Sequence, residues 1–105
     1  MANEIAQVIG TIERVSRKCE AKNKEGVLIF PDVDPSKGNM KFYGDNRWFI
    51  VDNIDDPNMP PTETEILLTY EFWDYKNKTY YRAKNIRPTE DVDEVELEGV
   101  ERIKS

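Results

Sequence analysis

Residues 66–86 read ILLTYEFWDYKNKTYYRAKNI, and this stretch decides the fold class. Its two ends, residues 66–73 and 80–86, are rich in aromatic and β-branched side chains, which favour strands. The polar residues 74–79 between them form a connection that is short enough for a β-hairpin. We therefore expect two antiparallel strands in this region.

The register of this hairpin depends on its turn. If Asn77 and Lys78 are the two central turn residues, apolar partners face inward and charged partners face outward. The pairs that this register forms are Phe72 with Ala83, Trp73 with Arg82, and Glu71 with Lys84. A slip of one residue would place Glu71 opposite Ala83, so side-chain alternation favours the register above.

Three other stretches have strand character, which makes five strands with the hairpin. They are residues 8–15, 26–30 and 47–51, with residues 41–43 left open as an extra strand. Gly10 in the first stretch indicates a bulge or a bend. Residues 52–64 contain three prolines and therefore form a surface loop. Five short strands favour an all-β fold, a small five-stranded OB-like (oligonucleotide-binding) Greek-key barrel, because closure hides the strand edges.

The 105 residues and their composition limit the functions that the chain can have. There is no His and only one Cys, which argues against the commonest general base and against a thiolate zinc site. We expect one domain with no enzymatic activity, no metal site and no cofactor. Residues 1–5 lack the start of a leader, and no apolar run is long enough to span a membrane, which predicts a cytoplasmic protein without a membrane contact.

Charge divides the chain into two parts. Residues 1–88 carry 14 acids and 13 bases, a net charge of −1, whereas residues 89–105 carry seven acids and two bases, a net charge of −5. We expect residues 1–88 to form the barrel and residues 89–105 to form an acidic, flexible tail. Alternation at Val95 and Leu97 leaves a short edge strand open as the alternative.

Parts of the barrel region resemble the cold-shock domain family. The resemblance lies in GTI at residues 10–12, in GVLIFPD at residues 26–32, in residues 47–54 and in AKNIRP at residues 83–88. The first is similar to the opening strand of the family, the next two are placed like its RNA-binding strands, and the last is similar to its final strand. The resemblance implies an OB barrel that binds single-stranded RNA or DNA by stacking bases on exposed aromatic rings.

The sequence departs from the family at most of the stacking positions. ERV at residues 13–15 stands where the family usually has Lys-Trp-Phe, and Val27 and Ile29 stand where it usually has aromatic residues. Trp48 is the stacking residue that the resemblance retains. Most of the family's binding platform is therefore missing from these strands.

Other aromatic residues could replace this platform, because rings stack on bases while cations contact phosphates. The candidate nucleic-acid-binding residues combine both types of side chain: Arg47, Trp48, Trp73, Tyr75, Lys76, Tyr80, Arg82 and Lys84. Lys78 belongs to the same region. The alternative is that half of the rings fill the barrel core and that the lysines keep the hairpin soluble.

Three other motifs are less specific. The basic side chains between Arg14 and Lys24 could bind phosphate, but interleaved acids favour a solvated connection. The stretch from Asp32 begins like a calcium loop, yet its glycine and its twelfth residue, Tyr43, do not fit that motif. Cys19 has cationic neighbours but no partner residue for catalysis.

The sequence leaves two functions open. The first is a non-catalytic OB module that binds single-stranded RNA or DNA through the candidate residues. The second is a protein-binding adaptor or inhibitor, such as a viral or mobile-element accessory protein, whose acidic tail contacts a basic partner. Oligonucleotide titration separates them, since only the first predicts binding that weakens as salt rises.

Overall fold

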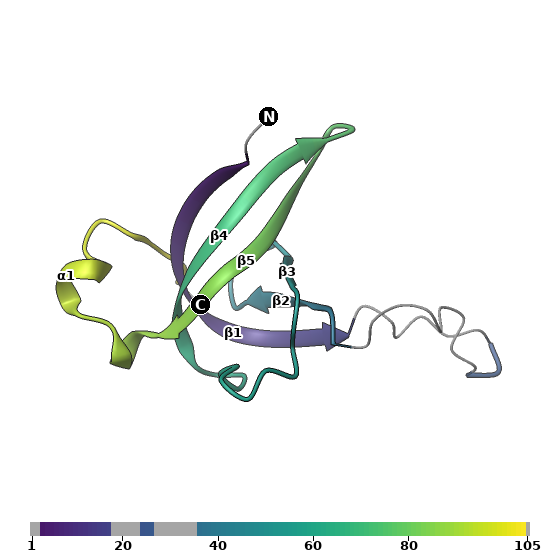
Figure 1. Cartoon of the computed structure of the whole chain (residues 1–105), viewed down its shortest axis with the longest axis horizontal. Coiled ribbons are helices and arrows are strands. Elements are labelled where there is room, and N and C mark those ends of the chain that lie inside the picture. The colour runs from purple at the N-terminus through teal and green to yellow at the C-terminus, as the bar shows by residue number, and fades with distance from the viewer. Residues whose placement is uncertain (1–2, 18–23, 27–35, 105) are drawn as a thin grey trace.

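The computed structural model describes residues 3–17, 24–26 and 36–104. Figure 1 shows the chain with its colour running from purple at the N-terminus to yellow at the C-terminus. The elements are β1 Glu4–Arg17, β2 Gly38–Phe42, β3 Phe49–Val51, β4 Glu65–Tyr75, β5 Lys78–Pro88, the 3-10 helix η1 Thr89–Asp91, α1 Glu94–Leu97 and β6 Glu101–Arg102. Residues 27–30 of the expected second strand lie outside the described residues, and the stretch left open at 41–43 falls largely within β2.

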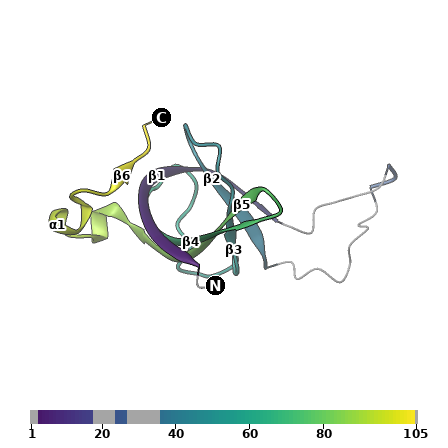
Figure 2. The ribbon, with the colours of Figure 1, turned by 90° about the horizontal axis from the view of Figure 1, so that it is seen from above.

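Five of these strands close into a barrel, which is seen from above in Figure 2. Neighbouring strands pair in the order β2-β3-β5-β4-β1, and β1 closes the ring because it also pairs with β2. The pairs in the ring are antiparallel except for β3 with β5, which are parallel. The small all-β OB-like barrel expected from the sequence is thereby confirmed.

β1 serves two neighbours because it is long and changes direction along its length (Figure 1). Its residues 4–11 pair with β4, and its residues 12–17 pair with β2. The register of β1 against β2 shifts between Ile12 and Arg14. The irregularity suggested at Gly10 therefore lies a few residues further along the strand.

Gly10 has a different role, which is to let another side chain approach the backbone. It pairs with Ile66 of β4 in regular register. A Cβ atom at residue 10 would lie only 2.6 Å from Cγ of Phe42, whose ring is fully buried. Glycine is needed here because any larger residue would push that ring out of the core.

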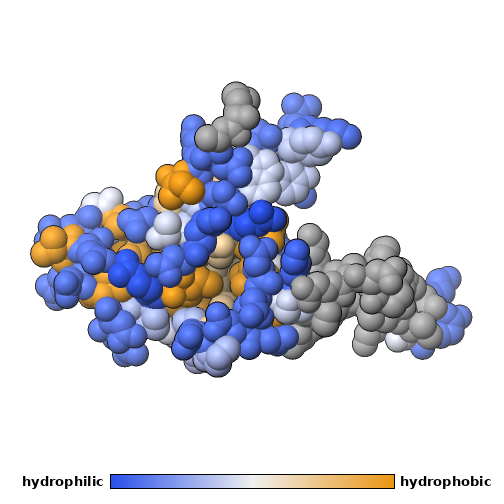
Figure 3. All heavy atoms as spheres, in the orientation of Figure 1, coloured by the Kyte–Doolittle hydropathy of each residue, from blue (hydrophilic) through white to orange (hydrophobic). Residues whose placement is uncertain are grey.

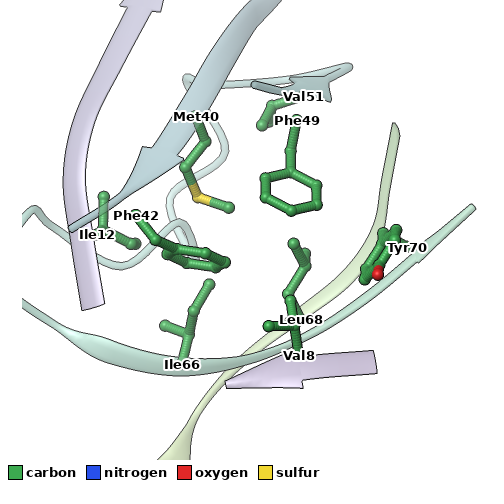
Figure 4. Packing of buried hydrophobic residues seen from close by; sticks show 9 residues of the cluster. All are labelled: Val8, Ile12, Met40, Phe42, Phe49, Val51, Ile66, Leu68 and Tyr70. Atoms are coloured by element: carbon green, nitrogen blue, oxygen red, sulfur yellow. The ribbon is translucent and has the colours of Figure 1, made fainter. Parts of the chain in front are cut away.

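The barrel interior is filled by one apolar cluster, shown in Figure 4. Its buried members are Val8, Ile12, Met40, Phe42, Phe49, Val51, Ile66, Leu68 and Tyr70. The ring of Phe49 lies 5.5 Å from that of Phe42 and 5.1 Å from that of Tyr70, measured between centroids. Such tilted and edge-on contacts are the favoured geometry of aromatic pairs, so Phe49 joins two sides of the barrel.

The predicted hairpin is present, but its predicted register is wrong. The turn residues are Lys76 and Asn77, with φ angles of 50° and 65°. Two consecutive positive φ angles define a type I′ turn, whose twist matches that of paired strands. The observed pairs on the outer face are Trp73 with Tyr80 and Glu71 with Arg82. Each of these pairs differs from the expected one by two residues, so these side chains keep their expected face. The register shifts again between Thr69 and Tyr70, and beyond this point Ile86 packs against the core.

The segment 89–104 lies along the outside of the barrel, on the side that carries α1 in Figure 1. Val92 is buried in a second apolar cluster with Ile9 of β1 and Leu67 of β4. Leu97 and Val100 pack against the same cluster. The apolar residues spaced through the acidic sequence thus contact the barrel, which differs from the loosely held tail that the charge suggested.

The last strand of this segment is β6, which pairs in parallel with β1 at Val8 and Ile9. The backbone N–H of Ile103 extends this pairing by donating a hydrogen bond of 2.8 Å to the carbonyl of Ile9. Residues 95 and 97 lie in α1, so the edge strand is not formed by them as the alternative proposed, but a few residues later.

The surface near α1 differs in hydropathy from the surface at the tip of the β4–β5 hairpin. Figure 3 shows apolar residues, in orange, gathered on the side that carries α1, whereas the tip of the β4–β5 hairpin is hydrophilic. Val95 is 77% exposed and Ile5 is 60% exposed. Within the described part of the chain, no helix has both the length and the apolar character that crossing a membrane requires.

Candidate nucleic-acid interface

The outer face of the barrel carries a row of side chains that crosses four strands. Met40 and Phe49 are buried in the core, so the alternating residues Asn39 and Ile50 lie on the outside. The cross-strand pairs of this row are Ser16 with Asn39, Asn39 with Ile50, and Ile50 with Arg82. Residues from β1, β2, β3 and β5 thus form one continuous surface.

A groove with a volume of about 720 Å³ lies over this row. It is lined by Ser16, Asn39, Asn46, Arg47, Trp48, Ile50, Lys78, Thr79, Tyr80 and Tyr81. This lining contains three aromatic rings and two cations, and none of its described residues is Asp or Glu. The whole chain has a net charge of −6, so the lining differs in character from the rest of the surface.

The aromatic part of the groove is formed by Trp48 and Tyr80. The Trp48 side chain precedes β3 and is 40% exposed, which is unusual for so large a ring. Tyr80 of β5 lines the groove and stacks on Trp73, with centroids 5.9 Å apart and planes inclined by 18°. The stack holds the Tyr80 ring in place, while Trp48 offers an open face to a ligand.

Cations lie over both rings of this stack. The ammonium group of Lys78 is 5.4 Å from the Tyr80 centroid, and the guanidinium of Arg82 is 5.5 Å from the Trp73 centroid. Both distances are within the range of a cation–π interaction. The outer face of the hairpin is therefore a ladder of alternating cations and rings, and its Lys78 end opens into the groove.

Arg47 lines the groove but is held by neighbours on several sides. Its Nε donates to Asp45 at 2.9 Å, and its Nη1 donates to the hydroxyl of Tyr70 at 3.0 Å. Its Nη2 lies 3.3 Å from Oε1 of Glu101 in β6. The guanidinium also stands over the Tyr81 ring, 5.8 Å from its centroid. Arg47 thus connects the groove, the barrel core and the C-terminal segment.

Two pKa shifts reflect these contacts. Burial by itself would lower the pKa of the Arg47 guanidinium, but the carboxylate of Asp45 and its hydrogen bond outweigh burial, so the pKa is raised. Burial is also the main cause that raises the pKa of the Tyr70 phenol, and the charge of Arg47 opposes it. Both groups therefore keep their protons throughout the neutral pH range.

The structure brings together only some of the candidate residues named from the sequence. Arg47, Trp48 and Tyr80 line the groove, and Trp73 supports Tyr80 from behind. Arg82 covers Trp73 but also lies 3.7 Å from carboxylate oxygens of both Asp52 and Glu71. Its charge is consequently shared between two acids.

The three other candidates lie away from the groove lining. Tyr75 is 57% exposed near the tip of the hairpin, and the ammonium of Lys76 stands 5.4 Å from the centroid of its ring. Lys84 lies 4.0 Å from Glu71 and borders a second, smaller cleft. These residues are placed so that they would contact only a ligand that extends beyond the groove.

Several residues that line the groove were not identified as candidates from the sequence. The polar and small members of this set are Ser16, Asn39, Asn46 and Thr79, and the apolar ones are Ile50 and Tyr81. Alternation in residues 39–42, read NMKF, was a usable signal for β2 and for the outward position of Asn39. The adjacent Gly38 obscured it, because a glycine followed by Asn reads as a turn.

Other sequence hypotheses fall on residues that are not described. They concern Cys19, the basic residues Lys18 and Lys22, the positions Val27 and Ile29, and the calcium-like stretch at 32–35. Of the basic stretch, Arg14 and Lys24 are described and exposed, and Arg17 is the last residue of β1.

The second cleft has a volume of about 410 Å³ and a lining that is partly polar and partly apolar. It lies between the loop after β3 and residues 83–86 of β5, with Asp52 and Asp56 on one side and Lys84 and Asn85 on the other. Within residues 3–17, 24–26 and 36–104, no three His, Cys, Asp or Glu side chains are grouped so that they could hold a metal ion. The lining of this cleft contains two acids, one cation and no aromatic ring, so it lacks the stacking surface of the groove.

Comparison with known proteins does not assign the chain to a family. The sequence matches no protein-family model, and a search of curated proteins returned no match.

Proposed function

We propose that this protein is a non-catalytic OB module that binds single-stranded RNA or DNA in the groove formed by β1, β2, β3 and β5. The observation that carries the proposal is the lining itself, which pairs the open face of Trp48 with Tyr80 and Lys78 and contains no carboxylate among its described residues. In OB barrels, oligonucleotides bind on the face of strands 2 and 3 beside the hairpin that joins strands 4 and 5. The groove occupies the corresponding place.

The chemistry of the lining suits a splayed single strand. Bases would stack on Trp48 and Tyr80, and each such stack is worth about 1–3 kcal/mol. The amides of Asn39 and Asn46 can donate to and accept from base edges, as the hydroxyl of Ser16 can. A duplex would offer no exposed base faces to these rings, so the proposal is specific for single strands.

Phosphate contacts play a smaller part in this proposal than in most nucleic-acid binders. Lys78 is the lining cation for which no carboxylate partner is found among the described residues, whereas Arg47 is held by two acids. Each phosphate contact contributes about −0.7 to the slope of log K against log salt for a single strand. The expected slope is therefore shallow, close to that of one or two contacts.

We also propose that the chain is related to the cold-shock domain family. The retained Trp48 and the similar stretches of sequence carry this proposal, whereas the strand order supports only an OB-like barrel. Tyr80, supported by Trp73, gives the groove a second ring beside Trp48. This ring comes from the hairpin and does not correspond to a stacking position quoted for the family.

Tryptophan fluorescence tests the proposal. The chain has two tryptophans, so Trp73→Phe leaves Trp48 as the single reporter while it preserves an aromatic partner for Tyr80. Titration with a mixed-sequence oligonucleotide of roughly ten nucleotides should give saturable quenching that decreases at higher salt. No change in Trp48 emission at low salt would contradict nucleic-acid binding and would favour a protein partner instead.

A further inference from the structure

Arg47 is the point where the groove meets the C-terminal segment 89–104. Its guanidinium lines the groove, yet its Nη2 lies 3.3 Å from Oε1 of Glu101 and its Nε lies 2.9 Å from Oδ2 of Asp45. One positive charge therefore stands between two negative ones. With the segment in place, two carboxylates face one guanidinium at this end of the groove, which disfavours the approach of a phosphate group.

The two acids differ in how firmly they are held. Asp45 is two residues from Arg47 in the same stretch of chain, and its side chain is only 12% exposed. The Glu101 side chain is 57% exposed and belongs to β6, a strand of two residues. An ion pair with so exposed a partner is weak, because water and salt screen it. Of the two acids, Glu101 is thus the one that can leave.

The part of the segment that carries Glu101 is held by several contacts at the edge of the barrel. β6 pairs with β1 at Val8 and Ile9, and the backbone N–H of Ile103 donates to the carbonyl of Ile9. Arg102 of β6 donates to Glu65 at 2.9 Å, and the Ile103 side chain packs against the core cluster. Elements with short pairings and exposed ends open more readily than the barrel core does. Release of β6 would break these contacts while the strand pairings of the barrel itself stay intact.

We propose that the C-terminal segment regulates the groove, because Glu101 competes with the phosphate of a bound strand for Arg47. This proposal rests on the nucleic-acid binding proposed above. When β6 is docked, Arg47 is neutralised by acids and the groove binds weakly. When β6 is released, Arg47 keeps Asp45 and the Tyr70 hydroxyl as partners, and the Nη2 group freed from Glu101 can donate to phosphate. By thermodynamic linkage, a bound strand must favour release of β6 to the same extent.

The first test compares Glu101→Gln with Glu98→Gln. Both substitutions remove one negative charge from the same segment, but the side chain of Glu98 is exposed and has no contact with Arg47. With a fluorescently labelled oligonucleotide, Glu101→Gln should tighten binding by roughly fivefold or more. It should also make the slope of log K against log salt steeper by about 0.7, the value of one added phosphate contact. Glu98→Gln should change neither quantity to this extent.

The second test measures the reverse effect in the unmodified protein. The amide of Ile103 donates to Ile9 only while β6 is docked, so its hydrogen exchange reports on docking. Saturation with the oligonucleotide should make this amide exchange faster, while amides of the barrel core stay protected. Unchanged or slower exchange of Ile103 on binding would overturn the proposed regulation.

The outcomes separate this proposal from the proposed function. If Trp48→Ala weakens oligonucleotide binding but Glu101→Gln behaves like Glu98→Gln, the groove binds nucleic acid and the regulation is wrong. If the unmodified protein binds poorly and Glu101→Gln binds well, the regulation is supported directly. If neither protein binds any oligonucleotide, both proposals are overturned.

Discussion

The indole of Trp73 faces the phenol ring of Tyr80 directly across the β4–β5 pair, and the two rings stack at an angle of 18°. This contact depends on the turn. With Lys76 and Asn77 at its centre, residue 73 pairs with residue 80, whereas a turn one residue later would pair it with Arg82. The position of the turn therefore decides whether Trp73 lies beside Tyr80, the ring that lines the groove.

Substitutions in the turn should distinguish the two registers. Asn77→Gly should stabilise the protein by about 0.5 kcal/mol, because glycine adopts a positive φ without steric cost. Lys78→Gly places glycine inside β5 and should cost about 0.5–1 kcal/mol. Urea denaturation measures both changes. The opposite signs, a loss for Asn77→Gly and a gain for Lys78→Gly, would place the turn at residues 77 and 78.

Gly10→Ala should destabilise the barrel by about 1–3 kcal/mol, because the added methyl group overlaps the ring of Phe42. Gln7→Ala, an exposed position on the same strand, is the matched control and should change stability by less than about 0.5 kcal/mol. Adding Phe42→Leu to Gly10→Ala should recover part of the loss. Strictly additive effects of the two substitutions, measured by denaturation, would show that the ring contact is not the cause.

Truncation after Glu90 should lower the melting temperature, although charge alone suggested a tail whose removal is neutral. The truncation exposes Ile9 and Leu67 and removes the buried Val92. Loss of about 2–3 kcal/mol of apolar burial corresponds to a fall of roughly 10 °C or more in a domain of this size. The control is Val95→Ser, at a position that is 77% exposed and should leave the melting temperature unchanged. An unaltered melting temperature after truncation would mean that the segment contributes nothing to stability.

Much of the fold could be predicted from local sequence. Alternation and β-branched residues located the strands around Val8, Phe49 and Leu68, and the prolines of 52–64 located the loop. The hairpin register could not be predicted from alternation, since a shift of two residues leaves each side chain on its face. Asn77 is a central turn residue in both choices and the other central residue is a Lys in each, so the turn preferences do not separate them either.

The candidate site could also be predicted only in part, namely where local sequence carried the signal. Trp48 and Tyr80 stood out as large rings beside cations, and both line the groove. Asn39 and Ser16 could not be linked to them, because only closure of the barrel brings β1 and β2 beside β3. The contact of residues 92–103 with the barrel could not be predicted, because acidic residues dominate the composition of this segment. The apolar side chains spaced between the acids make the contact.

The most direct test of the groove as a nucleic-acid site compares Trp48→Ala with Tyr75→Ala in affinity for one labelled single-stranded oligonucleotide. Both substitutions remove an exposed aromatic ring, but only Trp48 lines the groove. Trp48→Ala should weaken binding by about 1–3 kcal/mol, or roughly 5- to 150-fold in Kd, whereas Tyr75→Ala should change Kd by less than about twofold. Equal affinities of the two variants and the unmodified protein would contradict the groove as the binding site.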